Sequence, residues 1–323
     1  MGTVRDFMDM QFRHFNARET VDAARGWIDL MDRGGKMFLA MAGAMSTGEL
    51  GITLAKMIRA GKISAVSCTA ANFEEDIFNL LYHDDYKMVP RYPDLSPEEE
   101  EALYNKGFNR VTDTCIPESV IRFVDKYMIK YWAEAAATNS PKYPHELIFR
   151  LLDEPGIEKQ FHVPREHSWV LAAKEMGTPV FVPGWEDSTL GNIFTAQVIK
   201  GTVASHNAMR TGTEQLQRLA KWYQEQQVTN TPVGFFQIGG GIAGDFSICV
   251  VPMLIQDLKL EDTSFWAYFC QISDAVTSYG SYSGAVPNEK ITWGKLAKDT
   301  PKFMINSDAS IVAPLIFAYV LGM

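Results

Sequence analysis

The sequence predicts an α/β protein with a doubly wound, mostly parallel sheet of the Rossmann-like type. Short apolar runs of strand length alternate with longer segments whose apolar residues recur at helical spacing. Such an order places parallel strands side by side through right-handed crossovers. The chain has no internal repeat, low-complexity tract or linker, so residues 1–323 are expected to form a single domain.

The first part of the chain supplies two strands and three helices. The first helix is expected to end at Gly34 and Gly35 and the second at Gly61, because glycine commonly follows the last helical residue. The third begins with acidic residues, which suit the positive end of the helix dipole. The predicted strands span 37–42 and 63–68, and the predicted helices span 20–31, 47–60 and 74–81.

The alternation breaks near residues 84–115, which are predicted to form an irregular insertion. Prolines bracket a segment rich in aspartate and glutamate at 94–101. This composition is typical of a solvated surface excursion.

Strands and helices alternate again in the second part of the chain. The run Gly177-Thr178-Pro179 ends one helix and leads into a strand. Predicted helices span 116–137, 145–152, 168–176, 213–227 and 310–321, and predicted strands span 180–182, 233–238, 265–272 and 303–305. With the two earlier strands, these form a sheet of at least six strands.

Composition restricts the class of protein. Hydrophobic residues make up 46% and charged residues 21%, as in ordinary soluble proteins, and the net charge of −9 argues against a nucleic-acid partner. No uncharged run is long enough to span a membrane, and the N-terminus lacks the apolar core of a signal peptide, so a cytoplasmic location without membrane partners is expected. The cysteines and histidines show no metal-ligand spacing, so no metal site is expected.

Candidate ligand-binding residues lie in turns that follow the predicted strands, since ligands of open α/β sheets bind beyond the carboxyl ends of the strands. The turn after the strand at 233–238 matches G-x-G-x-x-G with Gly239, Gly241 and Gly244. This pattern lets the backbone approach a pyrophosphate, and a purely structural glycine turn explains it equally well. The four distinctive turns span 42–48, 69–76, 183–192 and 239–244.

Lys295 follows the pair Trp293-Gly294 near the end of the chain. A lysine is a nucleophile only when it is neutral, and an apolar wall such as Trp293 favours the neutral amine. The same triplet is also typical of a surface turn with a solvated lysine. Aromatic residues near the glycine-rich turns favour either an alkylammonium pocket or ordinary core packing; they are Trp185, Trp293, Tyr279 and Tyr282.

Five motifs together make the chain resemble the deoxyhypusine synthase family from about residue 38 to residue 314. The motifs are Cys68-Thr69-Ala70-Ala71-Asn72-Phe73-Glu74-Glu75-Asp76, Glu186-Asp187-Ser188-Thr189-Leu190-Gly191, Gly239-Gly240-Gly241, Ser283-Gly284-Ala285 to Trp293-Gly294-Lys295, and Ser307-Asp308-Ala309-Ser310. The resemblance implies a doubly wound NAD-binding fold and a homotetramer with active sites at subunit interfaces. It also implies NAD-dependent transfer of the aminobutyl group of spermidine, through a lysine imine, to an acceptor amine.

The resemblance assigns roles to residues that match the family's motifs. Lys295 is similar to the imine-forming lysine, Trp293 to the indole beside the amine, and Glu289 to a carboxylate that binds a substrate ammonium. The positions that resemble cofactor contacts are Thr69, Ala70, Glu75, Asp187, Thr189, Gly240, Gly241, Asp308 and Ala309.

The chain departs from the family at positions that would bind the polyamine. Asp245 follows the glycine turn where the family has a catalytic histidine nearby, and it is a candidate replacement acid or base. Asn192 and Tyr282 stand where the family has aspartates, and Ala42-Gly43 replaces a Ser-Asn pair on the nicotinamide side. These changes favour polyamine-type substrates with a small amine, rather than a protein lysine, as the acceptor.

Three hypotheses remain open at this stage. The first is the NAD-dependent transferase that acts through an imine on Lys295. The second is a catalytically weak relative that binds NAD as a regulatory or structural subunit. The third is an unrelated NAD(P) oxidoreductase, supported by residues 239–244 alone.

Overall fold

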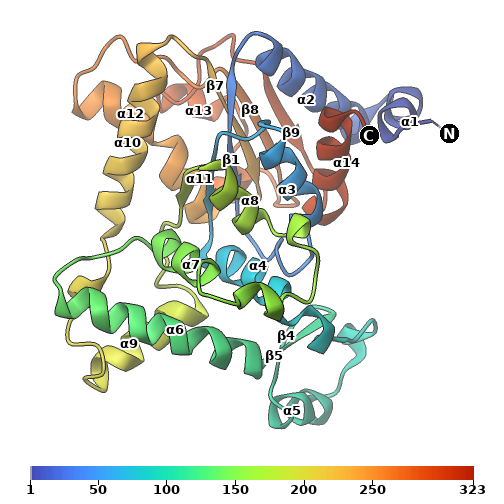
Figure 1. Ribbon diagram of the computed structural model, residues 1–323. Helices are drawn as coiled ribbons and strands as arrows, with labels where there is room; N and C mark the ends of the chain where they lie inside the picture. The colour runs from blue at the N-terminus through green and yellow to red at the C-terminus, as the bar shows by residue number, and fades with distance from the viewer. Residues whose placement is uncertain (1) are drawn as a thin grey trace.

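The computed structural model describes residues 2–323 and contains the predicted parallel sheet (Figure 1). The strands lie in the order β6-β2-β1-β7-β8-β9, and all neighbouring pairs are parallel. They are β1 (Lys36–Met41), β2 (Ala65–Cys68), β6 (Val180–Phe181), β7 (Val233–Ile238), β8 (Tyr268–Ile272) and β9 (Lys302–Ile305). The chain winds outward from β1 in one direction and from β7 in the other, so the predicted doubly wound fold class is confirmed.

Helices cover both faces of the sheet, as the alternation of side chains along β1 requires. Phe38 and Ala40 are buried on one face, and Leu39 and Met41 are buried on the other. The first face is covered by α10 (Gly212–Val228), α11 (Gly241–Ile248) and α12 (Val250–Pro252), and the second by α2 (Phe15–Asp32), α3 (Gly51–Arg59) and α14 (Ala309–Leu321). Figure 1 shows these two helical layers on opposite sides of the strands.

Further helices extend the molecule beyond the sheet (Figure 1). They are α4 (Ala70–Tyr82), α6 (Glu118–Ala137), α7 (Pro144–Leu152) and α9 (Thr189–Ile199), whereas α8 (Trp169–Met176) packs against α3. Helix α4 begins earlier than predicted because the Thr69 hydroxyl accepts a hydrogen bond from the Asn72 amide. Helix α9 was not predicted, although Ser188 caps it by accepting a hydrogen bond from the Gly191 amide.

The insertion near 84–115 is present but is not irregular, which corrects the prediction. It contains an antiparallel sheet in the order β3-β5-β4, formed by β3 (Lys87–Met88), β4 (Phe108–Val111) and β5 (Thr114–Pro117). It also contains α5 (Pro97–Asn105), which starts with a capping box between Ser96 and Glu99. Strand β5 is buried throughout, so this segment has a packed side as well as a solvated one.

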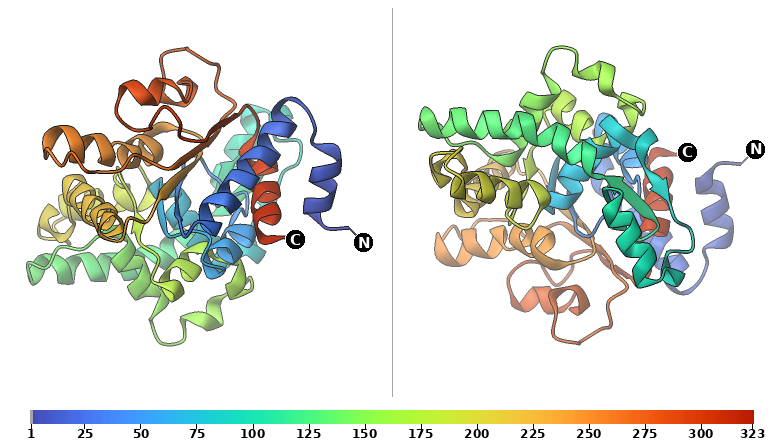
Figure 2. Two further views of the ribbon diagram at one scale, coloured as in Figure 1. Left: turned by 90° about the horizontal axis from the view of Figure 1, so that it is seen from above. Right: turned by 90° about the horizontal axis from the view of Figure 1, so that it is seen from below.

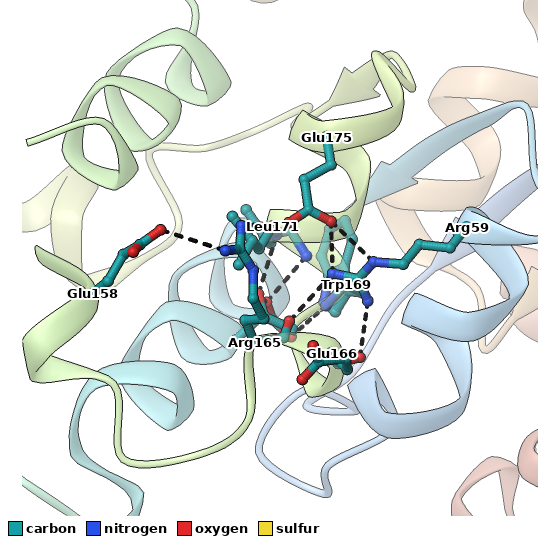
Figure 3. A network of polar contacts seen from close by, with 10 residues as sticks. Arg59, Glu158, Arg165, Glu166, Trp169, Leu171 and Glu175 are labelled. Atoms are coloured by element: carbon teal, nitrogen blue, oxygen red, sulfur yellow. Dashed lines mark hydrogen bonds and ion pairs between the residues drawn. The ribbon is translucent and has the colours of Figure 1, made fainter.

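A polar network fixes α8 against α3 (Figure 3). Arg59 of α3 donates to the Glu175 carboxylate at 2.9 Å and to the Glu166 carbonyl at 2.9 Å. Arg165 donates to the other oxygen of the Glu175 carboxylate at 2.8 Å. These contacts hold the start and the end of α8 on the second helical layer.

The two ends of the described chain lie close together (Figure 2). Helix α1 (Val4–Gln11) packs beside α14, and the Arg5 guanidinium donates to the Tyr319 carbonyl at 2.7 Å. Within residues 2–323, none of the helices has the length and apolar character needed to cross a membrane.

Candidate active site

The turns predicted to bind ligand lie at one edge of the sheet, because all six strands are parallel. The turn after β1 contacts both of its neighbours. The Thr69 hydroxyl and the Asn72 side-chain amide donate to the Gly43 carbonyl at 3.2 and 2.7 Å. The Ala42 amide donates to the Ile238 carbonyl, at the end of β7, at 3.0 Å. The ends of β2, β1 and β7 therefore form one continuous surface.

Helix α4 supplies two buried carboxylates that each hold another element. Glu74 accepts hydrogen bonds from the Thr189 and Leu190 amides at 3.0 Å, and so fixes the start of α9. Asp76 accepts from the Trp169 and Val170 amides at 3.3 and 3.1 Å, and so fixes the start of α8. Burial raises the pKa of Glu74 to about 7 and that of Asp76 to about 6. Both side chains have structural roles.

Glu75 is buried between these two acids and faces the turn after β1. Its carboxylate accepts a hydrogen bond from the Thr47 hydroxyl, and burial raises the pKa of Glu75. The family resemblance predicted Glu75 as a cofactor contact, and in the structure its carboxylate lies against Thr47 in the turn at 42–48. A carboxylate here holds that turn in shape at the sheet edge.

The glycine turn after β7 has the features of an anion site. A side chain at Gly240 would place its Cβ 1.8 Å from the Ser283 Oγ, so only glycine fits. Gly241 has a φ of +61° and begins α11, whose first turn has no side-chain cap. The first amide groups of such a turn have no partner within the helix and are available to an anion.

The remaining predicted cofactor residues follow other strands at the same sheet edge. Asp187 is exposed after β6, and Thr189 is held by Glu74. Asp308 and Ala309 follow β9, which is separated from β7 by β8. The Asp308 carboxylate accepts a hydrogen bond from the Ser310 amide at 2.7 Å and caps α14.

Lys295 lies in a pocket of about 470 Å³ on the α11 side of the sheet. Lys295 is only 6% exposed, and its Nζ donates to the Asp245 Oδ1 at 3.0 Å. The Cys249 thiol also donates to that oxygen at 3.3 Å, and burial raises the pKa of Cys249. The charged lining residues are Asp245, Glu289, Lys290 and Lys295, and other lining residues are Cys249, Ser281, Tyr282, Ala285 and Trp293.

Aromatic side chains surround the Lys295 amine. Its Nζ lies 5.2 Å from the ring centre of Tyr282 and 5.8 Å from that of Trp293. Trp293 is 63% exposed, so it forms the rim of the pocket, and Tyr282 forms the inner wall. Burial raises the pKa of Tyr282 well above its ordinary value, which keeps the hydroxyl protonated.

A hydrogen-bonded path joins this pocket to the glycine turn. The Tyr282 hydroxyl donates to the Gln237 Oε1 at 2.7 Å, and the Gln237 Nε2 donates to the Gly239 carbonyl at 2.9 Å. Ser283 packs directly on Gly240. A molecule bound at the glycine turn would therefore lie next to the pocket of Lys295.

The structure brings together four of the five residues predicted to bind substrate. Asp245, Tyr282, Glu289 and Trp293 line the pocket of Lys295. Asn192 is exposed on α9 and is not among the residues that line this pocket. Residues 2–323 contain no group of three His, Cys, Asp or Glu side chains arranged to hold a metal ion.

Lys290 is a pocket residue that the sequence did not indicate. It belongs to the short helix α13 (Glu289–Thr292) and is only 2% exposed. Burial, and then repulsion from Lys295, lowers the pKa of Lys290 to about 8. The position of Lys290 directly after Glu289, which matches the family motif, could have suggested that it lies near the site. The burial of Lys290 could not be predicted in this way, because it depends on residues from β8 and the following loop.

Comparisons with known proteins agree with the motifs. A curated "Deoxyhypusine synthase-like protein" of Cyanothece sp. is 26% identical over 99% of this chain and 79% of its own length. One of Chlorobaculum parvum is 28% identical over 98% of this chain and 84% of its own length. The fold is similar to a solved structure from Entamoeba histolytica described as a "putative deoxyhypusine synthase", with a TM-score of 0.57 and 14% identity over 97% of this chain and 91% of that one. The family model "Deoxyhypusine synthase" matches residues 7–320, and the chain belongs to the deoxyhypusine synthase family.

Proposed function

We propose that this protein is an NAD-dependent transferase that moves an aminobutyl-type group from a polyamine to a small amine through an imine on Lys295. Family membership supports a transferase of the aminobutyl-transfer type. The observation that carries the proposal is the buried Lys295 amine, 3.0 Å from the Asp245 carboxylate, in a pocket that adjoins the glycine turn.

The sheet edge fits NAD. The ends of β1 and β7 lie next to each other where the winding direction changes, which is where open α/β sheets bind dinucleotides. The uncapped start of α11 and the Gly240-Gly241 turn suit a pyrophosphate, and Thr69 and Ala70 border the neighbouring turn. When bound, NAD supplies the hydride acceptor that converts the donor amine to an imine and later the hydride that reduces the product imine. Glu75, Asp187, Thr189, Asp308 and Ala309 complete the proposed contact set.

Lys295 and Asp245 carry out the transfer itself. Lys295 first gives a proton to the Asp245 carboxylate. The resulting neutral amine then forms a bond to the imine carbon of the donor while the bond from that carbon to the departing amine breaks. The protonated Asp245 carboxyl returns that proton to the departing amine as it leaves. Attack of the acceptor amine on the Lys295 imine reverses these steps and releases the lysine.

The walls of the pocket fit the remainder of the substrate. Tyr282 and Trp293 supply aromatic surface for methylene groups and for an alkylammonium. Glu289 is exposed at the pocket and provides a carboxylate for a substrate ammonium. Asn192 is proposed to reach substrate only through subunit assembly, because it lies on α9 outside this pocket.

A homotetramer with interfacial active sites is part of the proposal. Apolar side chains stay exposed at the pocket and on neighbouring segments: Trp293, which lines the pocket, is 63% exposed, Ile242 at the start of α11 is 49% exposed, and Val276 after β8 is 75% exposed. An apolar rim of this kind suits association with a second copy of the chain.

Reductive trapping tests the proposed function. Borohydride is added to the protein with NAD and a panel of di- and triamines, and peptide mass spectrometry then locates any alkyl mass. An aminobutyl mass on Lys295 supports the transferase. NAD binding without an adduct from any amine supports the binding-only paralogue, and hydride transfer that survives Lys295→Ala supports an unrelated oxidoreductase.

A further inference from the structure

Lys290 places a second cationic group inside the pocket of Lys295. Its Nζ lies 4.8 Å from the ring centre of Phe269 and 5.0 Å from that of Tyr282, and it donates to the Ala285 carbonyl at 3.2 Å. Two aromatic rings and a carbonyl are the surroundings that proteins offer to an alkylammonium ligand. Here a side chain of the protein occupies them.

The charges that line the pocket are balanced without a substrate. Two lysines, Lys290 and Lys295, lie opposite two carboxylates, Asp245 and Glu289, so the formal sum is zero. Asp245 already accepts hydrogen bonds from Lys295 and Cys249 through one oxygen. Glu289 is the lining carboxylate that is left for a substrate ammonium.

The Lys290 group is mostly protonated at neutral pH, because its pKa is about 8. The Lys290 Nζ contacts a backbone carbonyl and two aromatic rings. Among residues 2–323, no carboxylate oxygen lies within 4.0 Å of this nitrogen. A triamine has two ammonium groups in addition to its reacting nitrogen. One of them can pair with Glu289, and the other would lie near the buried Lys290 ammonium. Like charges brought together in a desolvated site are strongly unfavourable.

We infer that Lys290 is a specificity-determining residue that restricts the donor beside Lys295 to diamines and excludes triamines. This inference rests on the proposed function. A diamine presents one reacting nitrogen and one ammonium, which pairs with Glu289. The NAD of the proposed function would accept the hydride that leaves the carbon at the reacting end, which becomes an imine carbon. Lys295 bonds to that carbon while its bond to the original nitrogen breaks, and this nitrogen leaves as ammonium after taking a proton from Asp245. The retained aminobutyl group then passes to the acceptor amine.

The experiment compares 1,4-diaminobutane with spermidine on the full chain, with NAD present. Adduct formation on Lys295 after borohydride treatment and equilibrium binding by calorimetry are both measured. The wild-type protein is expected to prefer the diamine by about tenfold or more in both measurements. Lys290→Met, which keeps the length of the side chain and removes its charge, is expected to shift the ratio toward the triamine by at least about tenfold.

Lys298→Met is the matched control, because Lys298 is exposed and is not among the residues that line the pocket. It should leave the ratio unchanged, and Lys290→Gln provides a second neutral variant if Lys290→Met does not fold. A wild-type preference for the triamine, or an unchanged ratio in a folded neutral variant, would overturn the inference. If no amine forms an adduct, the proposed function fails, and the binding ratio still decides the role of Lys290.

Discussion

The acids of α4 and the lysines of the Lys295 pocket are both ionisable groups withdrawn from water, but their surroundings differ. Glu74 and Asp76 each accept two backbone amide hydrogen bonds from the start of a helix. Lys290 and Lys295 face a cavity of about 470 Å³. Hydrogen bonds to amides compensate the buried acids and fix the positions of α8 and α9.

The lysine pair is only partly compensated. Asp245 contacts Lys295, whereas Lys290 has a carbonyl and two ring faces. A buried charge that opens onto a cavity costs stability and is typical of a functional site. Substitutions in the α4 acids should therefore lower stability, and substitutions in the lysine pair should change activity without lowering stability.

The largest expected effect is that of Lys295→Arg on the transfer reaction. Arginine keeps a positive charge next to Asp245 but does not form the imine, so activity should fall by at least about 10³-fold. Amine transfer and reductive trapping are the measurements, and urea unfolding should show little change in stability. Lys298→Arg is the control at an exposed site. An adduct formed at wild-type yield in Lys295→Arg would place the reacting amine elsewhere.

The opposite pattern is expected for Asp76→Ala. The substitution removes the acceptor for the Trp169 and Val170 amides and for the Ser168 hydroxyl, at the start of α8. Loss of these contacts should lower the free energy of unfolding by about 2–4 kcal/mol. Urea denaturation measures this, with the exposed Asp187→Ala as control. If Asp76→Ala is as stable as the wild-type protein, the free-energy cost of burying the Asp76 carboxylate equals the stabilisation from its hydrogen bonds.

Lys290→Met is expected to raise the free energy of unfolding, whereas substitution of an α4 acid is expected to lower it. This difference in sign distinguishes the lysine pair from the α4 acids. Burial lowers the pKa of Lys290 from 10.5 to about 8, so the folded state carries the full penalty below pH 8. Between about pH 8 and 10.5 the unfolded chain binds more protons at Lys290 than the folded protein does. The contribution of Lys290 to the free energy of unfolding of the wild-type protein therefore rises with pH in this range. Replacement by methionine should therefore stabilise the protein by about 1–3 kcal/mol at pH 7.

Urea unfolding at pH 7 and at pH 9.5 tests this prediction. The gain from Lys290→Met should shrink at the higher pH, where the lysine is largely neutral in the folded state. Lys298→Met, at an exposed lysine, should show no such change with pH. A loss of stability in Lys290→Met at pH 7 would show that the rings of Phe269 and Tyr282 more than compensate the buried charge.

The sequence predicts the sheet well because its strands are buried on both faces. Short continuous apolar runs such as 37–42, which follow Gly34 and Gly35, are typical of parallel strands buried on both faces. The insertion was predicted poorly because strands of two to four residues carry little periodicity, although Ser96 and Glu99 offered a capping-box signal for α5.

The site was predicted unevenly, for a related reason. Local motifs predict Lys295, Glu289 and the glycine turn as site elements, because backbone geometry and chemistry restrict the residues at those positions, and Lys295 and Glu289 do line one pocket. The neighbours of Lys295 depend on contacts between distant segments. Asn192 was expected near substrate and lies on α9, whereas Lys290 is buried by Phe269 and Tyr282, which no local pattern reveals.

The smallest expected effect concerns Glu175, which binds Arg59 and Arg165 near the surface (Figure 3). Glu175→Gln removes both ion pairs but keeps the length of the side chain. Because the partners are partly exposed, water and salt screen these pairs, and the loss should be below about 1 kcal/mol at physiological salt. Urea unfolding at low and at high salt tests this, since the difference from wild type should fade as salt rises. Glu158→Gln, whose carboxylate lies 3.4 Å from Arg165, is the weaker control. A loss of the size expected for Asp76→Ala would mean that the surface network, rather than the buried acids, holds α8 in place.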